Sequence, residues 1–596
     1  MITDELMTDT STEPAADAAA ETPPNTPPKS FLIANCGSVN TTVALFDAAA
    51  DSYRLVACVT VPTTAAEPWS NIHLGIQEAV AQIAAITGRM LMNQRGDLIR
   101  PARISGTGVD AFAAVVSAAP PLNTILVGLY EKVSLASARR ALNSAYAREL
   151  DAFSLADTRS ESEQIGSIIQ NQPDLIFVAG GANGGAEERL LQLIDTIQIG
   201  ALALSDVKRP RVLFAGNKAL RERIRTTLGE NIHLHVAENV RPSLDSENLA
   251  DAGQIVNELY EALKIKSLPG IQDVSEWSGF PLQPTAQALA DITTYFAALQ
   301  NGRVMAVDLG ANHITLVDAV PENRTRLCIQ SNMGMGQPIA NVLNKKPLSD
   351  ILRWLPSPMD AEKALDFIHN KALYPQTIPM TEPELRLEQA IAREALRDAM
   401  AEMCASWDNG RATMPLNLLL IAGQTLTAAP RPSQALLLLL DVLRPTGIFA
   451  AAMDVYGVLP GLGALAVHEP LAAVQSLEGG ALLDLGWVVA PMGKGQPGQT
   501  ALHIVMESEE SQRLEVEVEY GTIETLPLAP GRSAKVTLQP TRRFDVGFGP
   551  GKEKQVTIHG GAVGLVIDAR GRPLNLPADD EVRQALLRQW LWGVGG

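Results

Sequence analysis

The chain has 596 residues, 46% of them hydrophobic and 19% charged, which indicates a globular protein with several domains rather than one core. Its formal net charge of −18 repels phosphate backbones and anionic lipid headgroups, so the composition argues against a nucleic-acid or membrane partner. Four scattered cysteines (Cys36, Cys58, Cys328 and Cys404) have neither zinc-site nor disulfide spacing, which favours a reducing cytoplasm.

Residues 1–29 consist largely of Ala, Thr, Pro, Asp and Glu, which predicts a disordered N-terminal tail without signal-peptide character. No apolar run reaches the roughly 20 residues that a membrane-spanning helix needs. The leucine run Leu436–Leu440 is flanked by Gln434 and Asp441, so it predicts a buried helix.

An internal repeat follows the tail. A short apolar strand over 30–34, a turn that begins at Asn35, and β-branched strands predict an antiparallel meander. The same pattern returns over 304–330, where Asp308 takes the place of Asn35.

Each meander is followed by a helical stretch and then by a buried strand that ends in a glycine turn. These turns are Ala179–Gly185 and Ala215–Lys218 in the first half and Ala422–Thr425 in the second. A strand, a glycine turn and a helix bring backbone N–H groups close to a ligand, and their alternation predicts an α/β fold.

The sequence changes character near residue 498. Residues 514–520 alternate strictly between apolar and acidic, and several short strands with Gly or Pro turns follow, which predicts a separate β-sandwich or barrel. The expected organisation is a tail (1–29), a first lobe (30–300), a second lobe (301–490), a β-domain (498–577), and a final helix and tail (578–596).

The paired meanders resemble those of actin, Hsp70-type chaperones and sugar kinases, in which two hairpins with a D-x-G signature face each other across a nucleotide cleft. In that arrangement the turn glycine lets the backbone reach the phosphates, and the carboxylate orients a magnesium-bound water shell. The resemblance implies these cleft residues: Gly37, Ser38 and Thr41 from the first hairpin, Asp308 and Gly310 from the second, and Gly423 at the adenosine turn.

A more specific resemblance is to the MutL family of glutamate mutase operons, over roughly residues 30–490. The matching segments, in order, are Asn35–Thr41, Ala179–Gly185, Ala215–Lys218, Asn239–Pro242, Asp308–Ala311, Ala429–Pro432 and Asp454–Pro460. Each segment is short, but their joint order is specific. The β-domain lies outside the resemblance.

Three departures from the family pattern bear on nucleotide chemistry. The first aspartate is replaced by Asn35, so one carboxylate that would help to hold magnesium is absent. His313 stands where the family has small and hydroxyl residues, and Gln424 replaces the second glycine of the adenosine turn. We expect ATP or ADP with magnesium to bind near Asn35, His313 and Gln424, with Asp308 as the remaining metal-orienting and catalytic acid, and weak or lost hydrolysis.

The resemblance implies a nucleotide-binding chaperone or reactivase-type partner of an adenosylcobalamin-dependent mutase, in which a nucleotide-driven lobe rotation releases damaged cofactor. The alternative is a nucleotide-independent pseudo-ATPase scaffold of the actin-like fold, and both hypotheses leave a homo-oligomer open. A small-molecule kinase ranks third, because no catalytic base is evident. The cobalamin-binding D-x-H-x-x-G pattern is absent, with only a near miss at Asn71–Gly75, so we expect neither a mutase nor bound cobalamin.

Other polar groups fit ordinary structural roles better. His233 and His235 share one face of a strand without a further ligand nearby, and a basic segment from Lys218 to Arg225 predicts a solvated helix that could also meet an acidic partner. Asp441 and Asp454 flank an apolar segment, which favours roles as caps or ion-pair partners. The glycines over 547–551 lack P-loop spacing.

Overall fold

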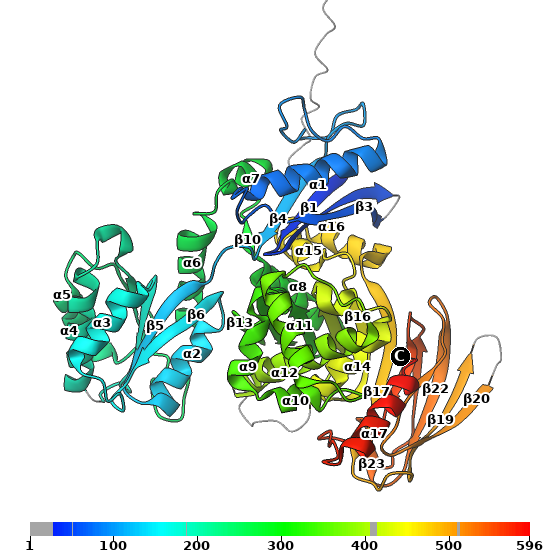
Figure 1. Cartoon of the computed structure of the whole chain (residues 1–596). Helices are drawn as coiled ribbons and strands as arrows, with labels where there is room; N and C mark the ends of the chain where they lie inside the picture. The colour runs from blue at the N-terminus through cyan, green and yellow to red at the C-terminus, as the bar shows by residue number, and fades with distance from the viewer. Residues whose placement is uncertain are drawn as a thin grey trace, which may run out of the picture.

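The computed structural model describes residues 28–49, 52–185, 187–322, 324–405, 414–508 and 513–595. Figure 1 shows a first lobe that lies against a larger second lobe, a domain that projects to one side, and a β-rich C-terminal region on the opposite side. The predicted tail over 1–29 lies outside the described residues up to position 27. Pro28 and Lys29 are fixed to the first lobe, because the Tyr53 hydroxyl donates to the Pro28 carbonyl and the Lys29 N–H donates to Asp110.

The first lobe contains the predicted meander. Strand order is β10-β4-β1-β2-β3, in which β1, β2 and β3 are antiparallel and β4 is parallel to β1. The strands and helices of this lobe are β1 (Ser30–Cys36), β2 (Asn40–Ala49), β3 (Ser52–Pro62), α1 (Ile72–Thr87), β4 (Ala111–Val116), α7 (Ile271–Trp277), β10 (Gln283–Pro284) and α8 (Thr285–Gln300). Alternate residues of β1 face α1, so Leu32, Ala34 and Cys36 enter the core beneath that helix.

The second lobe repeats this arrangement. Strand order β13-β12-β11-β15 reproduces β3-β2-β1-β4, and β15 is parallel to β11. Its elements are β11 (Val304–Leu309), β12 (His313–Val320), β13 (Arg324–Ser331), α9 (Val342–Lys345), α10 (Leu348–Leu352), α11 (Ala361–Leu373), α12 (Glu382–Ala405), β14 (Met414–Pro415), β15 (Leu418–Ala422), α13 (Gln424–Thr427), α14 (Pro432–Leu443), β16 (Pro445–Met453), α15 (Leu459–Ala466), α16 (Pro470–Ser476) and β17 (Leu483–Ala490). The repeated order is that of the actin-like fold, so the predicted fold class is confirmed. The leucine run Leu436–Leu440 is buried within α14, as expected.

Two helices, α8 and α15, connect the lobes, and each packs on the lobe opposite to the one from which it starts. Helix α8 leaves the first lobe and packs on the sheet of the second, whereas α15 leaves the second lobe and packs on Phe31 and Ile33 of the first. The helices meet at Gly463, where a Cβ would lie 2.0 Å from the carbonyl oxygen of Ala288. At Gly461 a Cβ would lie 1.9 Å from the Ile33 side chain, so both approaches require glycine.

The predicted first lobe over 30–300 contains an additional domain, inserted between β4 and β10. Its parallel sheet has the order β6-β5-β7-β8-β9 and is separate from the sheet of the lobe. Its elements are β5 (Leu122–Gly128), α2 (Ala136–Leu142), β6 (Ala147–Phe153), α3 (Glu161–Asn171), β7 (Leu175–Ala179), α4 (Glu188–Leu202), β8 (Arg211–Phe214), α5 (Arg221–Leu228), β9 (Leu234–Val236) and α6 (Ala250–Tyr260). Two glycine turns that the sequence assigns to the lobe, Ala179–Gly185 and Ala215–Lys218, belong to this inserted sheet.

The C-terminal strands are not a separate domain of the kind predicted for 498–577. Strand β25 pairs with β17, and β21 pairs with β25, so the sheet of the second lobe continues into this region. A four-stranded antiparallel sheet, β20-β19-β22-β24, shares one core with this extension and forms a sandwich. The elements are β18 (Met492–Gly493), β19 (Thr500–Ser508), β20 (Arg513–Glu519), β21 (Ile523–Leu526), β22 (Ser533–Pro540), β23 (Phe544–Asp545), β24 (Lys554–His559), β25 (Gly564–Asp568) and α17 (Asp580–Gly593).

A buried ion network fastens the C-terminal region to the second lobe. Arg570 contacts Asp441 at 2.6 Å and Asp568 at 2.8 Å, and Arg393 approaches the other oxygen of Asp441 at 2.7 Å. The guanidinium of Arg570 also lies 4.8 Å from the ring centre of Trp590. Asp441 is thus an ion-pair partner, and its charge is compensated as burial requires.

Within the described ranges, no helix combines the length and the apolar character that crossing a membrane would require.

The crossing at Gly463 generates a test. We expect Gly463→Ala to lower the free energy of unfolding by about 1–3 kcal/mol, because the new methyl group must displace the backbone of α8. Gly166→Ala in α3 is the matched control: a Cβ there meets nothing within 4 Å, so it should stabilise by about 0.5–1 kcal/mol. Thermal and urea unfolding of both variants measures the difference, and equal stabilities would contradict the close crossing.

Candidate functional site

The two hairpin turns have the same geometry. The N–H of Gly37 donates to the carbonyl of Asn40 at 2.9 Å, and the N–H of Gly310 donates to the carbonyl of His313 at 3.0 Å. A Cβ at either glycine would lie within 3.0 Å of that carbonyl, so both turns need glycine. The repeat that pairs Gly37 with Gly310 therefore pairs Asn40 with His313.

The position before each turn has the same place in its sheet. In the sheet register Asn35 pairs with Thr42 and Asp308 pairs with Thr315, so each acid position has a threonine beside it. The Asn35 carboxamide donates to the carbonyl of Gly457 in the second lobe at 3.0 Å. The residue that replaces the first aspartate thus serves as a bridge between the lobes.

A second buried carboxylate, that of Asp454, acts on Asp308 through its charge. Asp454, at the end of β16, is buried, and its two oxygens accept the N–H groups of Val458 and Leu459, where α15 begins, at 2.9 and 2.8 Å. Burial raises the pKa of Asp308 to about 7, with a further contribution from the charge of Asp454. Burial also raises the pKa of Asp454 to about 6, although the backbone N–H groups oppose the shift.

The two acids would suit a magnesium ion rather than a metal cage built from protein ligands alone. Among the described residues no group of three or more His, Cys, Asp or Glu side chains gathers in metal-binding range. Magnesium commonly takes one or two carboxylates and completes its shell with water and substrate phosphates. Asp308 and Asp454 would supply the carboxylates, and a cation beside them would lower the pKa of both groups.

The glycine turn at Gly423, where the resemblance places adenosine, lies against the second hairpin. Gly423 has φ 92°, and a Cβ there would lie 2.3 Å from the carbonyl oxygen of Leu309. The next residue, Gln424, accepts a hydrogen bond from the Asn40 carboxamide at 2.5 Å. Asn40–Gln424 and Asn35–Gly457 are therefore two direct bonds between the lobes, both made by neutral side chains.

His313 does not present a cation to the cleft. Its ring is buried, packs edge-on against Tyr146 with centroids 4.6 Å apart, and has a pKa lowered by burial to about 3. Its Nδ1 atom has no hydrogen-bond partner among the described residues. The Tyr146 hydroxyl accepts the N–H of Ala286 at the start of α8, at 3.1 Å, so a neutral histidine packs beside a tyrosine that holds the connecting helix.

Of the remaining expected residues, Thr41 lies on the opposite face of the sheet from Asn35, because it pairs with Cys36. Its buried hydroxyl lies toward α1, 3.5 Å from the position of a Cβ at Gly75. Ser38 lies in the first turn. The threonine on the interlobe face is Thr42, whose hydroxyl bonds to that of Thr60 at 2.9 Å.

Sequence reasoning missed Asn40, Thr42, Tyr146 and the proximity of Asp454 to Asp308. The repeat contains a signal for Thr42, because the offset that carries Asn35 to Asp308 also carries Thr42 to Thr315, and strand alternation separates Thr42 from Thr41. The contacts of Tyr146 and Asp454 join segments far apart in the chain and leave no local signal.

A hollow of about 410 Å³ adjoins the row formed by Asn35, Thr42 and Thr60. On its border the Cys58 thiol lies 3.6 Å from the carbonyl oxygen of Tyr456, a third contact between the lobes. The residues that line it are Leu55, Val56, Ala57, Cys58, Thr60, Val455 and Tyr456. Neither Asp308 nor Gly423 is among them, so the hollow is distinct from the carboxylate pair.

Comparisons with known proteins identify relatives of the chain. Residues 31–479 match the family model described as MutL protein. A curated relative, Protein MutL of Clostridium tetanomorphum, is 25% identical over 308 residues, which cover 48% of this chain and 64% of the relative. The aligned part therefore spans less than two thirds of that relative.

Solved structures with similar backbones are more distant. Nucleotide-free acetone carboxylase has 11% identity, covers 82% of this chain and 81% of its own, and has a TM-score of 0.33. A nucleotide-free diol dehydratase-reactivating factor has 11% identity, covers 74% of this chain and 100% of its own, and has a TM-score of 0.30. A reductive activator for a corrinoid, iron-sulfur protein has 9% identity, covers 75% of this chain and 62% of its own, and has a TM-score of 0.24.

The carboxylate pair predicts how stability depends on pH. The pKa of Asp308 is raised in the folded state, so the folded protein binds more protons than the unfolded chain between pH about 4 and 7. Stability should therefore fall as pH rises through this window, by about 1.4 kcal/mol per unit of pKa difference. We expect Asp308→Asn to remove this loss, so that the variant melts above the wild type at pH 8 and close to it at pH 4.5.

Melting temperatures measured across this range without divalent cations provide the test. Asp206→Asn is the control, because that side chain is 89% exposed in the inserted domain. An Asp308→Asn curve parallel to that of the wild type would contradict a raised pKa at Asp308.

Proposed function

The chain belongs to the MutL family, and from that membership we propose that it is an accessory protein of an adenosylcobalamin-dependent mutase, with an interlobe cleft that binds ATP or ADP with magnesium. The observation that carries the nucleotide part is the pair of repeated glycine turns, with the buried Asp308 before the second turn and Asp454 acting on its charge. The mutase partner rests on the family resemblance. The proposal that the cleft binds nucleotide and magnesium rests on Asp308, Asp454 and the glycine turns.

The side chains in the cleft divide into a charged pair and a neutral pair. Asp308 and Asp454 attract a divalent cation, and magnesium, when bound, neutralises phosphate charge and positions the phosphates. Asn35 and Asn40 carry no charge and donate to acceptors in the second lobe. Because no carboxylate stands at position 35, binding is favoured over hydrolysis, and the protein is at most a weak ATPase.

The neutral bonds give the cleft a way to respond to nucleotide. Asn40 and Gln424 lie on the hairpin turn and the adenosine turn, the two segments expected to meet phosphate and adenosine. A nucleotide between them must replace their 2.5 Å bond with contacts to itself. Binding would thereby change how the lobes are held, in the manner of hinge closure around a ligand.

The same bonds favour a second candidate function, a scaffold that does not depend on nucleotide. The lobes are joined by Asn35–Gly457, Asn40–Gln424 and Cys58–Tyr456 contacts between protein atoms. A pseudo-ATPase scaffold would keep these contacts permanently and bind its partner in one conformation.

Isothermal titration of the full chain with ATP and with ADP, with and without magnesium, separates the two functions. We expect magnesium-enhanced binding that weakens at least tenfold, or about 1.4 kcal/mol, in Asp308→Ala. Asp206→Ala, an exposed carboxylate in the inserted domain, is the control and should bind as the wild type does.

The outcome decides between the candidates. Absence of heat and of thermal stabilisation at millimolar nucleotide, together with nucleotide-independent association with a purified cobalamin mutase, would overturn the nucleotide switch and support the scaffold. Magnesium-dependent binding that is equal in Asp308→Ala would overturn the assignment of the metal-orienting acid.

Restoring the family aspartate is a gain-of-function test. Asn35→Asp removes the donor to the Gly457 carbonyl and adds a carboxylate beside the segment whose N–H groups bond to Asp454. We expect it to melt below the wild type without magnesium, because like charges at short range repel, and to gain more stability from magnesium. Asn35→Ala is the control, since it loses the same bond without adding charge. Equal magnesium responses of the two variants would refute a cation site at this position.

A further inference from the structure

The inserted domain is doubly wound. Its first strand, β5, lies between the second, β6, and the third, β7, followed by β8 and β9. Helices α2 and α6 contribute to the core on one face of the sheet, and α3, α4 and α5 contribute to the core on the other. The winding therefore reverses between β5 and β7, and ligands of open α/β sheets bind at the carboxyl ends of the strands at such a reversal.

The loop after β7 runs along this carboxyl edge. Residues 180–185 have the sequence Gly-Gly-Ala-Asn-Gly-Gly, with positive φ at Gly181 (72°) and Gly184 (79°). The loop lies directly against the turn after β8, because the Asn217 N–H donates to the Gly180 carbonyl at 3.1 Å and a Cβ at Gly216 would lie 2.5 Å from that oxygen. Successive N–H groups in such glycine loops form concavities that suit anions.

Three asparagine side chains fix the loop. Asn239 donates to the Gly181 carbonyl at 3.0 Å and to the Asn183 side chain at 3.1 Å. The side-chain oxygen of Asn217 accepts the N–H of Gly184 at 3.3 Å, and it also accepts the N–H of Ala219 at 3.1 Å.

One donor at the base of this loop is unused. Asn217 is fully buried, and its Nδ2 atom has no hydrogen-bond partner in the described part of the chain. A buried donor without an acceptor costs about 1–3 kcal/mol. A ligand that brings an acceptor to this position would remove the cost.

The charged side chains around the loop indicate which kind of ligand could bring this acceptor. Glu238 is shared by Lys218 at 2.7 Å and Arg221 at 3.3 Å. Glu247 is shared by Arg140 and by Arg241, the latter at 3.0 Å.

These four cations face two shared glutamates, and Asp251, which accepts the N–H of Glu238, adds a third carboxylate. Among these seven groups cations outnumber carboxylates by one, in a protein whose net charge is −18. Glu187 and Glu188 precede and begin α4, so an anion is favoured on the side of β8 and β9 rather than at the N-terminus of α4.

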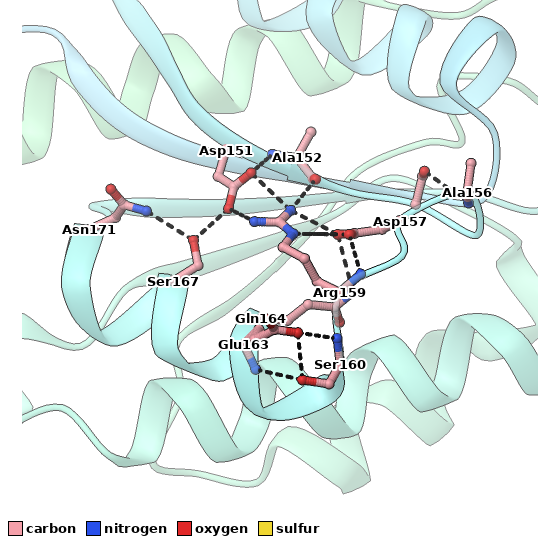
Figure 2. A network of polar contacts seen from close by, with 11 residues as sticks. Asp151, Ala152, Ala156, Asp157, Arg159, Ser160, Glu163, Gln164, Ser167 and Asn171 are labelled. Carbon is pink, nitrogen blue, oxygen red and sulfur yellow. Dashed lines mark hydrogen bonds and ion pairs between the residues drawn. The ribbon is translucent and has the colours of Figure 1, made fainter.

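The neighbouring basic group shows the contrast. At the carboxyl end of β6, Arg159 binds Asp151, Asp157 and the carbonyl of Ala152, as Figure 2 shows, and its guanidinium also lies 5.2 Å from the ring centre of Phe153. Ser160 and Glu163 form a capping box at the start of α3 beside it. The guanidinium of Arg159 is thus fully engaged by groups of the same domain, which is a structural role. At the edge near Asn217, by contrast, the Nδ2 donor has no partner among the described residues.

We propose that the carboxyl edge of the inserted domain is a second ligand site, which binds the phosphate group of a small molecule. Asn217 Nδ2 and the N–H groups of Gly181 and Ala182 donate to the phosphate oxygens, because those of Asn183, Gly184 and Gly185 already bond within the domain. Lys218 and Arg241 supply the positive field. The site lies in a different sheet from Asp308 and does not depend on the nucleotide cleft.

The test uses the full chain and inorganic phosphate as the probe. We expect phosphate to bind in isothermal titration and to slow hydrogen exchange in peptides that cover 180–185 and 215–218. Asn217→Asp keeps the acceptor for Gly184 and Ala219 but places a negative oxygen where the free donor stood, so it should weaken binding at least tenfold. Asn231→Asp makes the same change at an exposed position just before β9, at the amino edge of the sheet, and should leave binding unchanged.

Two further variants keep the test decisive. Lys218→Glu alters a half-exposed side chain and should also weaken phosphate binding if Asn217→Asp folds poorly. Asp308→Ala should leave protection at 180–185 intact, which separates this site from the nucleotide cleft. Equal protection in the wild type and in Lys218→Glu, or protection confined to the hairpin turns at 37–40 and 310–313, would overturn the proposal.

Discussion

The capping of α15 by Asp454 is the interaction on which the arrangement of the two lobes depends. Its carboxylate accepts the N–H groups of Val458, just before the helix, and of Leu459, its first residue. The helix then reaches the first lobe through Gly461 and α8 through Gly463. Asp454 is also the group whose charge raises the pKa of Asp308 further, beyond the effect of burial. The cleft acid and the helix that joins the lobes are consequently one structural unit, so a change in charge at the cleft acts directly on the start of the connecting helix.

For the nucleotide site proposed above, magnitudes indicate which feature of the cleft would control binding. Each neutral bond between the lobes contributes about 0.5–1.5 kcal/mol net, whereas a micromolar ligand gains about 8 kcal/mol. Breaking the Asn40–Gln424 bond is therefore a small cost. The larger obstacle is the pair of acids, since ionising both Asp308 and Asp454 near pH 7 requires a compensating positive charge. Electrostatics at the two acids, more than closure of the lobes, would therefore set the dependence of the proposed site on a cation.

The sequence predicts the elements that repeat and fails where contacts join distant segments. The internal repeat places both hairpins and both acid positions correctly, because a tight glycine turn leaves a local pattern. The family motif matches Thr41, although Thr42 shares the sheet face of Asn35, because a motif does not specify which face of a strand a residue occupies. The inserted domain merges with the first lobe in the prediction because a buried strand with a glycine turn looks alike in either sheet. The prediction separates the β-domain from the second lobe, because strands β17 and β25 are far apart in the sequence and their pairing leaves no local pattern.

The inserted domain contacts the second lobe and α8 through the segment that joins α2 to β6. The carbonyl of Asn143 accepts the N–H of Ile329 in the second lobe at 2.6 Å, and Tyr146 packs on His313 while its hydroxyl holds Ala286 at the start of α8. Tyr146, a residue of the inserted domain, thus contacts both the second lobe and the connecting helix α8. A rotation of the lobes about α8 and α15 must either carry this segment along or break its contacts, and coupling between sites requires contacts that differ between two states. The neutral, buried state of His313 suits that position, because an aromatic contact without charge can break and reform at little electrostatic cost.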